Sequence, residues 1–333
     1  CEALARYIGL EARGWGINAH SVPEIYYDNA WHLLDSSLIT YFRNKDESIA
    51  GVEQIIAACR VLESPLAISY LGPEGTFCNI AAVRKFGPGA TLVPLSSIDE
   101  IFVMVEKKTA NYGVVPVENS IAGVERTTLD RFVNSPVRIC AESYVDIQHN
   151  LLSKSPMERI AKVYSHPQAL DQCQAWLRAN LPGAELVEVS STARAAQLAA
   201  GEAGAAGIGT ELASSIYDLP IVSSGIQDRA DNRTRFLIIG REETTPSGKD
   251  KTSIIFAVPH RAGSLWESLG VFERHKINMT MIESRPTKQT HWEYLFFADV
   301  QGHHSEEPLA TALKDLSKEA LFVKVLGSYP EAD

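Results

Sequence analysis

The chain has 333 residues, of which 45% are hydrophobic and 22% charged, and its formal net charge is −10 at pH 7. These proportions are typical of a globular protein with two or three domains. Acidic and basic residues are mixed and no basic tract occurs, so no nucleic-acid-binding surface is expected. No apolar run approaches the roughly 20 residues of a membrane-spanning helix and no signal peptide opens the sequence, so no membrane association is expected.

The five cysteines are odd in number, scattered, and include no CxxC pair. This pattern favours a reducing compartment, so we expect a cytoplasmic protein. It also lacks the ligand spacing of a zinc site. We therefore expect no metal site.

The first 46 residues differ in character from the rest. The stretch HSVPEIYYDNAWHLLDSS (20–37) resembles the hairpin and Asp-bearing strand of transglutaminase-like cysteine-protease folds. Cys1, His20 and Asp35 could imitate a Cys-His-Asp triad, but the spacing from cysteine to histidine is short and the segment is too small for a full core. We therefore favour an extra β-rich appendage, or the remnant of a gene fusion.

The middle of the chain has the pattern of an α/β domain. An amphipathic helix and a linker are expected over 47–65, and short apolar strands then alternate with helical segments over 66–241. One helix is expected to begin at Ser97, because Glu100 follows at the capping-box spacing. The length of this region is compatible with one domain or with two lobes.

The C-terminal third begins after a polar linker at 242–251, which contains Pro246 and Gly248. Over 252–330 the pattern predicts strand, helix, strand, strand, helix, strand. That order is typical of a ferredoxin-like βαββαβ domain.

Five short polar stretches in the middle region follow predicted strands. In open α/β sheets, ligands bind at the carboxyl ends of the strands. Taken singly, each stretch has a plainer explanation as a turn or a helix cap. The stretches are YLGPEGTFC (70–78), VVPVENSIAG (114–123), YSHPQALDQC (164–173), VSSTARAA (189–196) and IQDRADNRTRF (226–236).

Together, in this order, the motifs GPEGTF, PVENS, SHPQAL, STA and NRTRF resemble those of the prephenate dehydratase family, over about residues 60–240. The C-terminal region resembles the ACT regulatory domain of that family. Its Gly-Ala-Leu motif is matched by GSL at 263–265, and its Glu-Ser-Arg-Pro motif by ESRP at 283–286. One departure is Cys78, where the family usually has Ser.

The resemblance implies a two-lobed α/β domain like the type II periplasmic binding proteins, and conversion of prephenate to phenylpyruvate, water and carbon dioxide without a cofactor. It marks Thr234 as the catalytic threonine. We hypothesise that Thr234 donates a hydrogen bond to the departing hydroxyl, with Glu118 as the proton source. Guanidinium groups pair well with carboxylates, so Arg235 and Arg233 are candidates to bind the substrate. The remaining candidates are Asn119, Gln168 and Ser165 for catalysis and Thr76, Ser120 and Thr192 for binding.

The ACT resemblance implies feedback inhibition by L-phenylalanine. The effector pocket is expected near the strand end that faces the first turn of the domain, between subunits of a homodimer or homotetramer. The residues expected to form it are Gly263, Ser264, Leu265, Asn278, Thr280, Glu283 and Ser284.

Three other functions stay open at this point. A bifunctional chorismate mutase and prephenate dehydratase is one, although residues 1–46 lack the long charged first helix of a mutase domain. A non-catalytic amino-acid sensor with the same two domains is another. The third is a cysteine hydrolase that uses Cys1.

Overall fold

The computed structural model describes residues 11–17, 20–27, 30–33, 66–87, 89–286 and 294–332. The chain divides into two compact units, Cys1–Pro65 and Leu66–Asp333. In the first unit, β1 (Glu11–Ile17), β2 (His20–Tyr27) and β3 (Ala30–Leu33) form an antiparallel sheet in the order β1-β2-β3. Cys1, Asp35 and the helix expected within 47–65 lie outside the described residues.

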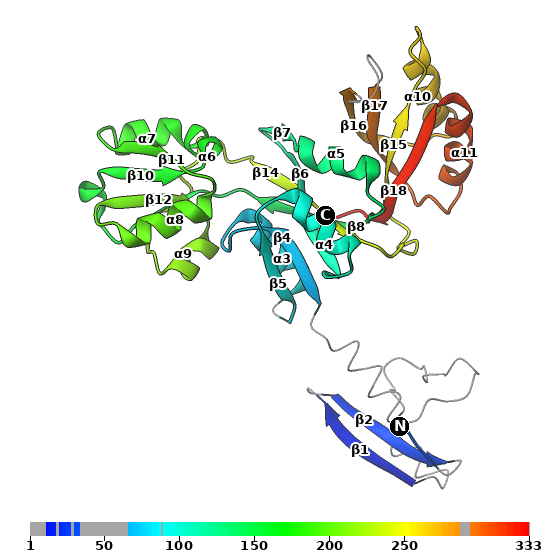
Figure 1. Cartoon of the computed structure of the whole chain (residues 1–333), viewed down its shortest axis with the longest axis horizontal. Coiled ribbons are helices and arrows are strands. Elements are labelled where there is room, and N and C mark those ends of the chain that lie inside the picture. Colours follow the sequence, from blue (N-terminus) through cyan, green and yellow to red (C-terminus); the bar gives the residue numbers. More distant parts are fainter. Residues whose placement is uncertain are drawn as a thin grey trace. The chain divides into compact units, whose positions relative to one another are not determined.

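The second unit begins with an α/β lobe whose sheet has the strand order β5-β4-β6-β14-β8 (Figure 1). Strand β4 is parallel to β5 and β6, whereas β14 is antiparallel to both of its neighbours, β6 and β8. The elements are β4 (Ala67–Leu71), α3 (Phe77–Phe86), β5 (Thr91–Leu95), α4 (Ile98–Glu106), β6 (Tyr112–Asn119), β7 (Gly123–Val124), α5 (Arg126–Asn134), β8 (Arg138–Asp146) and β14 (Arg233–Gly240).

Helix α4 shows how local sequence starts these elements. The Ser97 hydroxyl accepts a hydrogen bond from the Glu100 backbone N–H at 3.2 Å, and the Glu100 carboxylate accepts one from the Ser96 N–H at 2.9 Å. These bonds satisfy N–H groups that a helix start leaves without partners. The predicted start at Ser97 is therefore confirmed.

A second α/β lobe is inserted between β8 and β14. Its sheet has the order β11-β10-β12-β9-β13, with α6 and α7 on one face and α8 and α9 on the other (Figure 1). The elements are β9 (Asn150–Leu152), η1 (Met157–Arg159), β10 (Lys162–Ser165), α6 (Pro167–Gln172), α7 (Gln174–Asn180), β11 (Glu185–Glu188), α8 (Thr192–Gly201), β12 (Ala205–Gly209), α9 (Glu211–Tyr217) and β13 (Ile221–Ser223).

Two segments, 147–149 and 224–232, carry the chain into the second lobe and back. They are hydrogen-bonded to each other, since the Ile147 N–H donates to the Asn232 carbonyl at 2.8 Å and the Ile226 N–H to the His149 carbonyl at 2.9 Å. This region therefore has two lobes joined by two crossing segments, as the family resemblance implied.

The C-terminal domain has the predicted βαββαβ order and an antiparallel sheet β16-β17-β15-β18 (Figure 1). Side chains on one sheet face, including Ile254 and Phe256, pack with its two helices, whereas Ile255, Phe297 and Tyr329 share a core with the first lobe. The sheet is thus covered on both faces. Its elements are β15 (Asp250–Ala257), α10 (Ser264–Arg274), β16 (Met279–Pro286), β17 (Tyr294–Gln301), α11 (Leu309–Glu319) and β18 (Phe322–Pro330).

The contact between this domain and the first lobe is close. A Cβ atom on Gly327 of β18 would collide with the carbonyl oxygen of Ile139 in β8. The absence of a side chain lets the two backbones meet there. Among the described residues, no helix is long and apolar enough to span a bilayer.

Candidate active site and regulatory cavity

A cavity of about 860 Å³ lies between the two α/β lobes. Its walls come from the ends of β4 and β6, the start of β14 and the first turns of α3, α6 and α8. The parallel strands of each lobe end toward it, as expected for a ligand site in α/β sheets. Six of the predicted catalytic and substrate-binding residues line it, namely Thr76, Glu118, Asn119, Gln168, Thr192 and Thr234.

Thr234 is held by Asn119 from the neighbouring strand. These residues are partners in the β6–β14 register, and the Asn119 Nδ2 donates a hydrogen bond to the Thr234 Oγ1 at 2.8 Å. Because Oγ1 accepts this bond, the hydroxyl hydrogen of Thr234 points to another partner. The hydroxyl can therefore act as a donor to a molecule in the cavity.

Side chains that the sequence analysis did not select extend this contact. The Asn119 Nδ2 also donates to the Asn232 Oδ1 at 2.7 Å, and the Asn232 Nδ2 donates to the Gln172 Oε1 at 3.1 Å. The Gln172 Oε1 lies 2.8 Å from the His149 Nε2. Asn232 and Gln172 stand inside two of the quoted motifs, whereas no sequence signal marked His149.

His149 is 2% exposed and its ring meets Phe77 of α3 edge-on, with ring centroids 5.7 Å apart. Burial lowers the pKa of the imidazole, and the hydrogen bond to Gln172 only partly offsets this. His149 is therefore neutral at physiological pH.

The glycine-rich turn before α3 joins the lobes on another side of the cavity. Gly75 has a φ of 87°, a conformation that glycine adopts readily, and its carbonyl accepts a hydrogen bond from the Thr210 hydroxyl at 2.6 Å. The Tyr217 hydroxyl donates to the Glu74 carbonyl at 3.0 Å. Thr76 caps α3, because its hydroxyl donates to the Leu71 carbonyl and accepts from the Asn79 N–H. The hydroxyl of Thr76 is thus already used in the turn.

Four of the predicted catalytic and substrate-binding residues do not line the cavity, and two of them are serines. Ser165 is fully buried and donates to the Ile208 carbonyl at 3.2 Å. The Ser120 hydroxyl accepts from the Arg233 N–H at 2.9 Å and donates to the Asp231 carbonyl. These serines support the backbone around the cavity and do not face a ligand.

Arg233 is also outside the cavity wall. Its guanidinium lies 3.3 Å from the Asp146 carboxylate and stacks over the Tyr144 ring at 4.8 Å. The expectation that Arg233 reaches a substrate in the cavity does not match this geometry.

A model of the prephenate dehydratase family matches residues 68–244, and one of the ACT domain matches residues 252–318. The chain belongs to the prephenate dehydratase family. A bifunctional chorismate mutase/prephenate dehydratase of Aquifex aeolicus is 48% identical over 280 residues, which is 84% of this chain and 77% of that protein. The prephenate dehydratase of Amycolatopsis methanolica is 38% identical over 271 residues, covering 80% and 89% of the two chains.

Solved structures agree with this family. The prephenate dehydratase of Arthrobacter aurescens in complex with L-Phe has a TM-score of 0.73 and 31% identity, covering 80% of this chain and 90% of that one. GqqA, described as a novel type of quorum quenching acylase, has a TM-score of 0.74 and 27% identity, covering 80% and 98%. The two-lobed unit is thus the dehydratase domain, and the C-terminal domain is an ACT domain.

Arg235 lies between the dehydratase and ACT domains, and not at the cavity where a substrate contact was expected. It is 5% exposed, and its guanidinium donates to the Glu142 carboxylate at 2.7 Å, the Asp299 carboxylate at 2.5 Å and the Tyr329 hydroxyl at 2.9 Å. Successive side chains of a strand point to opposite faces, so Thr234 and Phe236 line the cavity while Arg235 faces away from it. The structure does not support a substrate contact for Arg235.

The charges around Arg235 form a closed cluster. Lys251 of the ACT domain contacts both oxygens of the Glu142 carboxylate, at 2.9 and 3.1 Å. Burial alone would raise the pKa of Glu142, but Arg235 and Lys251 outweigh it and hold the pKa below its usual range. Two cations therefore satisfy this buried carboxylate, one from each domain.

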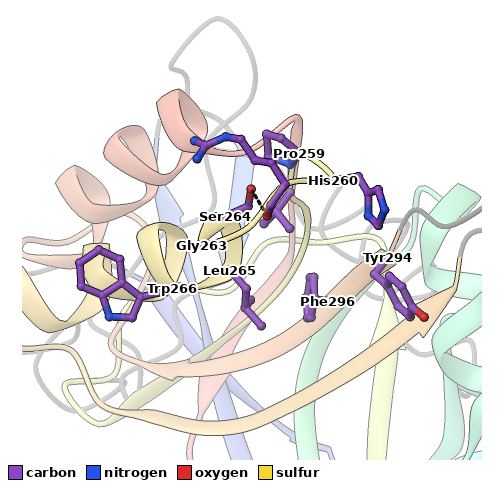
Figure 2. Close-up of a pocket in the computed structure, with 10 residues that line it drawn as sticks. Pro259, His260, Gly263, Ser264, Leu265, Trp266, Tyr294 and Phe296 are labelled. Atoms are coloured by element: carbon purple, nitrogen blue, oxygen red, sulfur yellow. Dashed lines mark hydrogen bonds between the residues drawn. The ribbon is translucent and has the colours of Figure 1, made fainter.

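The ACT domain has a cavity of about 320 Å³ at the turn before α10, and Gly263, Ser264 and Leu265 line it as expected (Figure 2). The other walls come from 258–261, Trp266 and two aromatic residues of β17, Tyr294 and Phe296. The Ser264 hydroxyl donates to the Arg261 carbonyl at 3.1 Å, which fixes the turn.

The remaining effector candidates lie elsewhere. Asn278, Thr280, Glu283 and Ser284 do not line this cavity; they stand on or just before β16, an edge strand of the ACT sheet. Arg285 of the same motif donates to the Asp130 carboxylate of the dehydratase domain at 2.8 Å. Within one chain, the two ACT motifs therefore do not form one pocket.

Proposed function

We propose that this protein converts prephenate to phenylpyruvate in the cavity between the dehydratase lobes. The observation that carries the proposal is the Thr234 hydroxyl, held by Asn119 in the wall of that cavity with its hydrogen left for another partner. The reaction breaks the ring C–O bond and the bond to the ring carboxylate. The carboxylate leaves as carbon dioxide, its bonding electrons complete the aromatic ring, and the departing hydroxide takes a proton to become water.

Thr234 donates a hydrogen bond to the departing hydroxyl in this proposal. A threonine hydroxyl is a weak acid, so a second group must supply the proton. Glu118 lines the same cavity from β6, the strand that pairs with β14, and is assigned that role. Gln168 and Thr192 provide neutral polar contacts from the second lobe.

Prephenate carries two carboxylates, and neither Arg233 nor Arg235 lines the cavity. We assign the binding of the two carboxylates to the first turns of α3 and α8. Helix α3 lines the cavity at Phe77, and helix α8 lines it at Thr192. The N-terminus of a helix presents unpaired backbone N–H groups and the positive end of its dipole, which together favour an anion. This arrangement replaces the guanidinium clamp that the sequence suggested.

The ACT cavity is proposed to bind L-phenylalanine as an inhibitor, with support from the L-Phe complex of the Arthrobacter aurescens relative. Four effector candidates would reach L-phenylalanine across a subunit contact in a homodimer or homotetramer, namely Asn278 just before β16 and Thr280, Glu283 and Ser284 of β16. The enzyme is proposed to work in the cytoplasm.

The test is steady-state formation of phenylpyruvate from prephenate, with and without L-phenylalanine. Turnover that L-phenylalanine reduces supports both assignments, whereas no turnover by folded protein contradicts the dehydratase assignment. Consumption of chorismate, measured in parallel, decides whether the chain also has the mutase activity in the name of its Aquifex aeolicus relative.

A further inference from the structure

We propose that Gln172 and His149 are positioning residues of the reaction. They form the far end of a hydrogen-bonded chain of fixed polarity that orients the Thr234 hydroxyl, and this inference rests on the proposed role of Thr234. Neither residue was predicted from the sequence to act in the site, and both line the cavity.

The polarity of the chain starts at Asn119. Its Oδ1 accepts hydrogen bonds from the backbone N–H groups of Ile121 at 3.0 Å and Ala122 at 2.8 Å. A backbone N–H can only donate, so this side of the amide must be the oxygen. The Nδ2 of Asn119 therefore faces Thr234 and Asn232, and donates to both.

The donor and acceptor roles of the following side chains are then determined in turn. Asn232 uses its Oδ1 to accept from Asn119, so its Nδ2 donates to the Gln172 Oε1. The Gln172 Oε1 also forms a hydrogen bond with the His149 Nε2 at 2.8 Å. An amide oxygen can only accept, so this nitrogen must carry the hydrogen. The hydrogen bond thereby places a hydrogen on the His149 Nε2. Burial lowers the pKa of the ring, which favours the neutral form with that single hydrogen.

At the His149 end of this hydrogen-bonded series, two polar atoms have no hydrogen-bond partner within the described residues. The His149 Nδ1 and the Gln172 Nε2 are buried side-chain atoms without a hydrogen-bond partner. Buried polar atoms almost always have partners, so exceptions call for an explanation. A network kept for stability alone would pair these two atoms; this one holds Gln172 Oε1 in place at the edge of a binding cavity.

The series of hydrogen bonds from Thr234 to His149 also connects the two lobes. Asn119 and Thr234 belong to the first lobe, whereas Gln172 ends α6 of the second lobe and His149 lies in a crossing segment. Opening of the lobes would separate Asn232 from Gln172, and the Asn232 amide that accepts from Asn119 would lose the contact that holds its orientation. The direction of the Thr234 hydroxyl thus depends on how the two lobes meet.

The test uses variants of the full-length protein. Gln172→Met keeps the length of the side chain but removes the acceptor, and we expect kcat to fall roughly 10- to 100-fold with a small change in KM, because small misplacements of reacting groups have effects of that size. His149→Leu should behave alike. His149→Gln places an amide N–H where Nε2 was, so it should restore kcat to within about threefold of the wild type.

Ser153→Ala is the matched control. Ser153 is also buried in the second lobe and donates to the Ala205 carbonyl at 2.7 Å, but it does not line the cavity. Its thermal stability should fall while kcat stays unchanged. If Gln172→Met retains the wild-type kcat, or if His149→Gln is as impaired as His149→Leu, the positioning role is refuted.

A second readout does not depend on turnover. ¹⁵N NMR of labelled histidine should show His149 as the neutral tautomer protonated at Nε2, with a changed signal in Gln172→Met. A tautomer protonated at Nδ1 would contradict the assigned polarity of these hydrogen bonds even in an active enzyme. Absence of turnover by the wild type would instead refute the proposed function, with the tautomer still decided by NMR.

Discussion

Thr234 and Arg235 are consecutive residues of β14, yet their side chains serve different parts of the molecule. Thr234 lines the cavity between the lobes, while the Arg235 guanidinium is buried against Asp299 and Tyr329 of the ACT domain. A rigid strand that carries both residues gives a physical route by which the ACT domain can act on Thr234. Such a route needs evidence of coupling, and not only proximity.

The first prediction concerns this coupling. Asp299→Asn removes one charge from the Arg235 cluster but keeps the shape of the side chain. We expect L-phenylalanine still to bind, as calorimetry would measure, but its effect on kcat/KM to shrink by about fivefold or more, since allosteric coupling is typically 5- to 150-fold. Turnover without the effector should stay near that of the wild type. Unchanged inhibition would show that the effector signal takes another route.

The second prediction concerns Thr234 itself. Thr234→Ala should lower kcat by about 100-fold or more, because it removes the donor to the leaving hydroxyl. Thr234→Ser keeps the hydroxyl and the bond from Asn119, so it should retain much more activity. Circular dichroism and thermal melting of both variants check that the fold persists. Turnover of Thr234→Ala at the wild-type rate would remove this residue from the mechanism.

The motifs in the sequence predicted which residues would meet, because the carboxyl ends of parallel strands share one edge of a sheet. Thr76, Glu118 and Gln168 come together for this reason, and Thr234 joins them from the start of the antiparallel strand β14. The two-domain fold was also predictable, since the alternating pattern and the βαββαβ order are strong signals.

The direction of Arg235 could not be predicted in the same way. Alternation of polar and apolar residues reveals the faces of a strand only where one face meets water. In β14 every residue from Arg235 to Gly240 is buried, because the ACT domain covers the second face of the sheet. His149 was missed since its partner Gln172 is distant along the chain and no pattern links them.

The third prediction concerns Cys78, which lines the cavity where the family usually has Ser. Burial raises the pKa of this thiol to about 12, so it is protonated and a weak nucleophile at neutral pH. Iodoacetamide at neutral pH should leave Cys78 unmodified, as peptide mass spectrometry would show, and Cys78→Ser should keep most of the activity. Rapid labelling of Cys78, or loss of turnover in Cys78→Ser, would point to chemistry at the thiol.

The fourth prediction concerns the effector cavity. Gly263 has a φ of 88°, which residues with a Cβ rarely adopt, and it lines the ACT cavity. Gly263→Val should therefore displace the turn that lines the cavity and weaken L-phenylalanine binding, measured by calorimetry, by about 10-fold or more, which corresponds to about 1.4 kcal/mol of binding free energy. A point variant is preferable to deletion of the ACT domain, because deletion would expose the core around Leu237 and leave Arg235 without Asp299. Wild-type affinity in Gly263→Val would place the effector elsewhere.

The last prediction concerns stability against pH. His149 has a pKa below its usual value of 6.5, mainly because of burial. The unfolded chain therefore binds a proton on lowering the pH through 6.5 while the folded protein does not, so acid favours unfolding and the free energy of unfolding falls. Urea unfolding between about pH 7.5 and about pH 5.5 should show this fall in the wild type and a shallower one in His149→Gln, which has no group to titrate there. Equal slopes for the two proteins would mean that His149 takes up a proton as readily in the folded state, against the neutral tautomer that the Asn119–Gln172 chain requires.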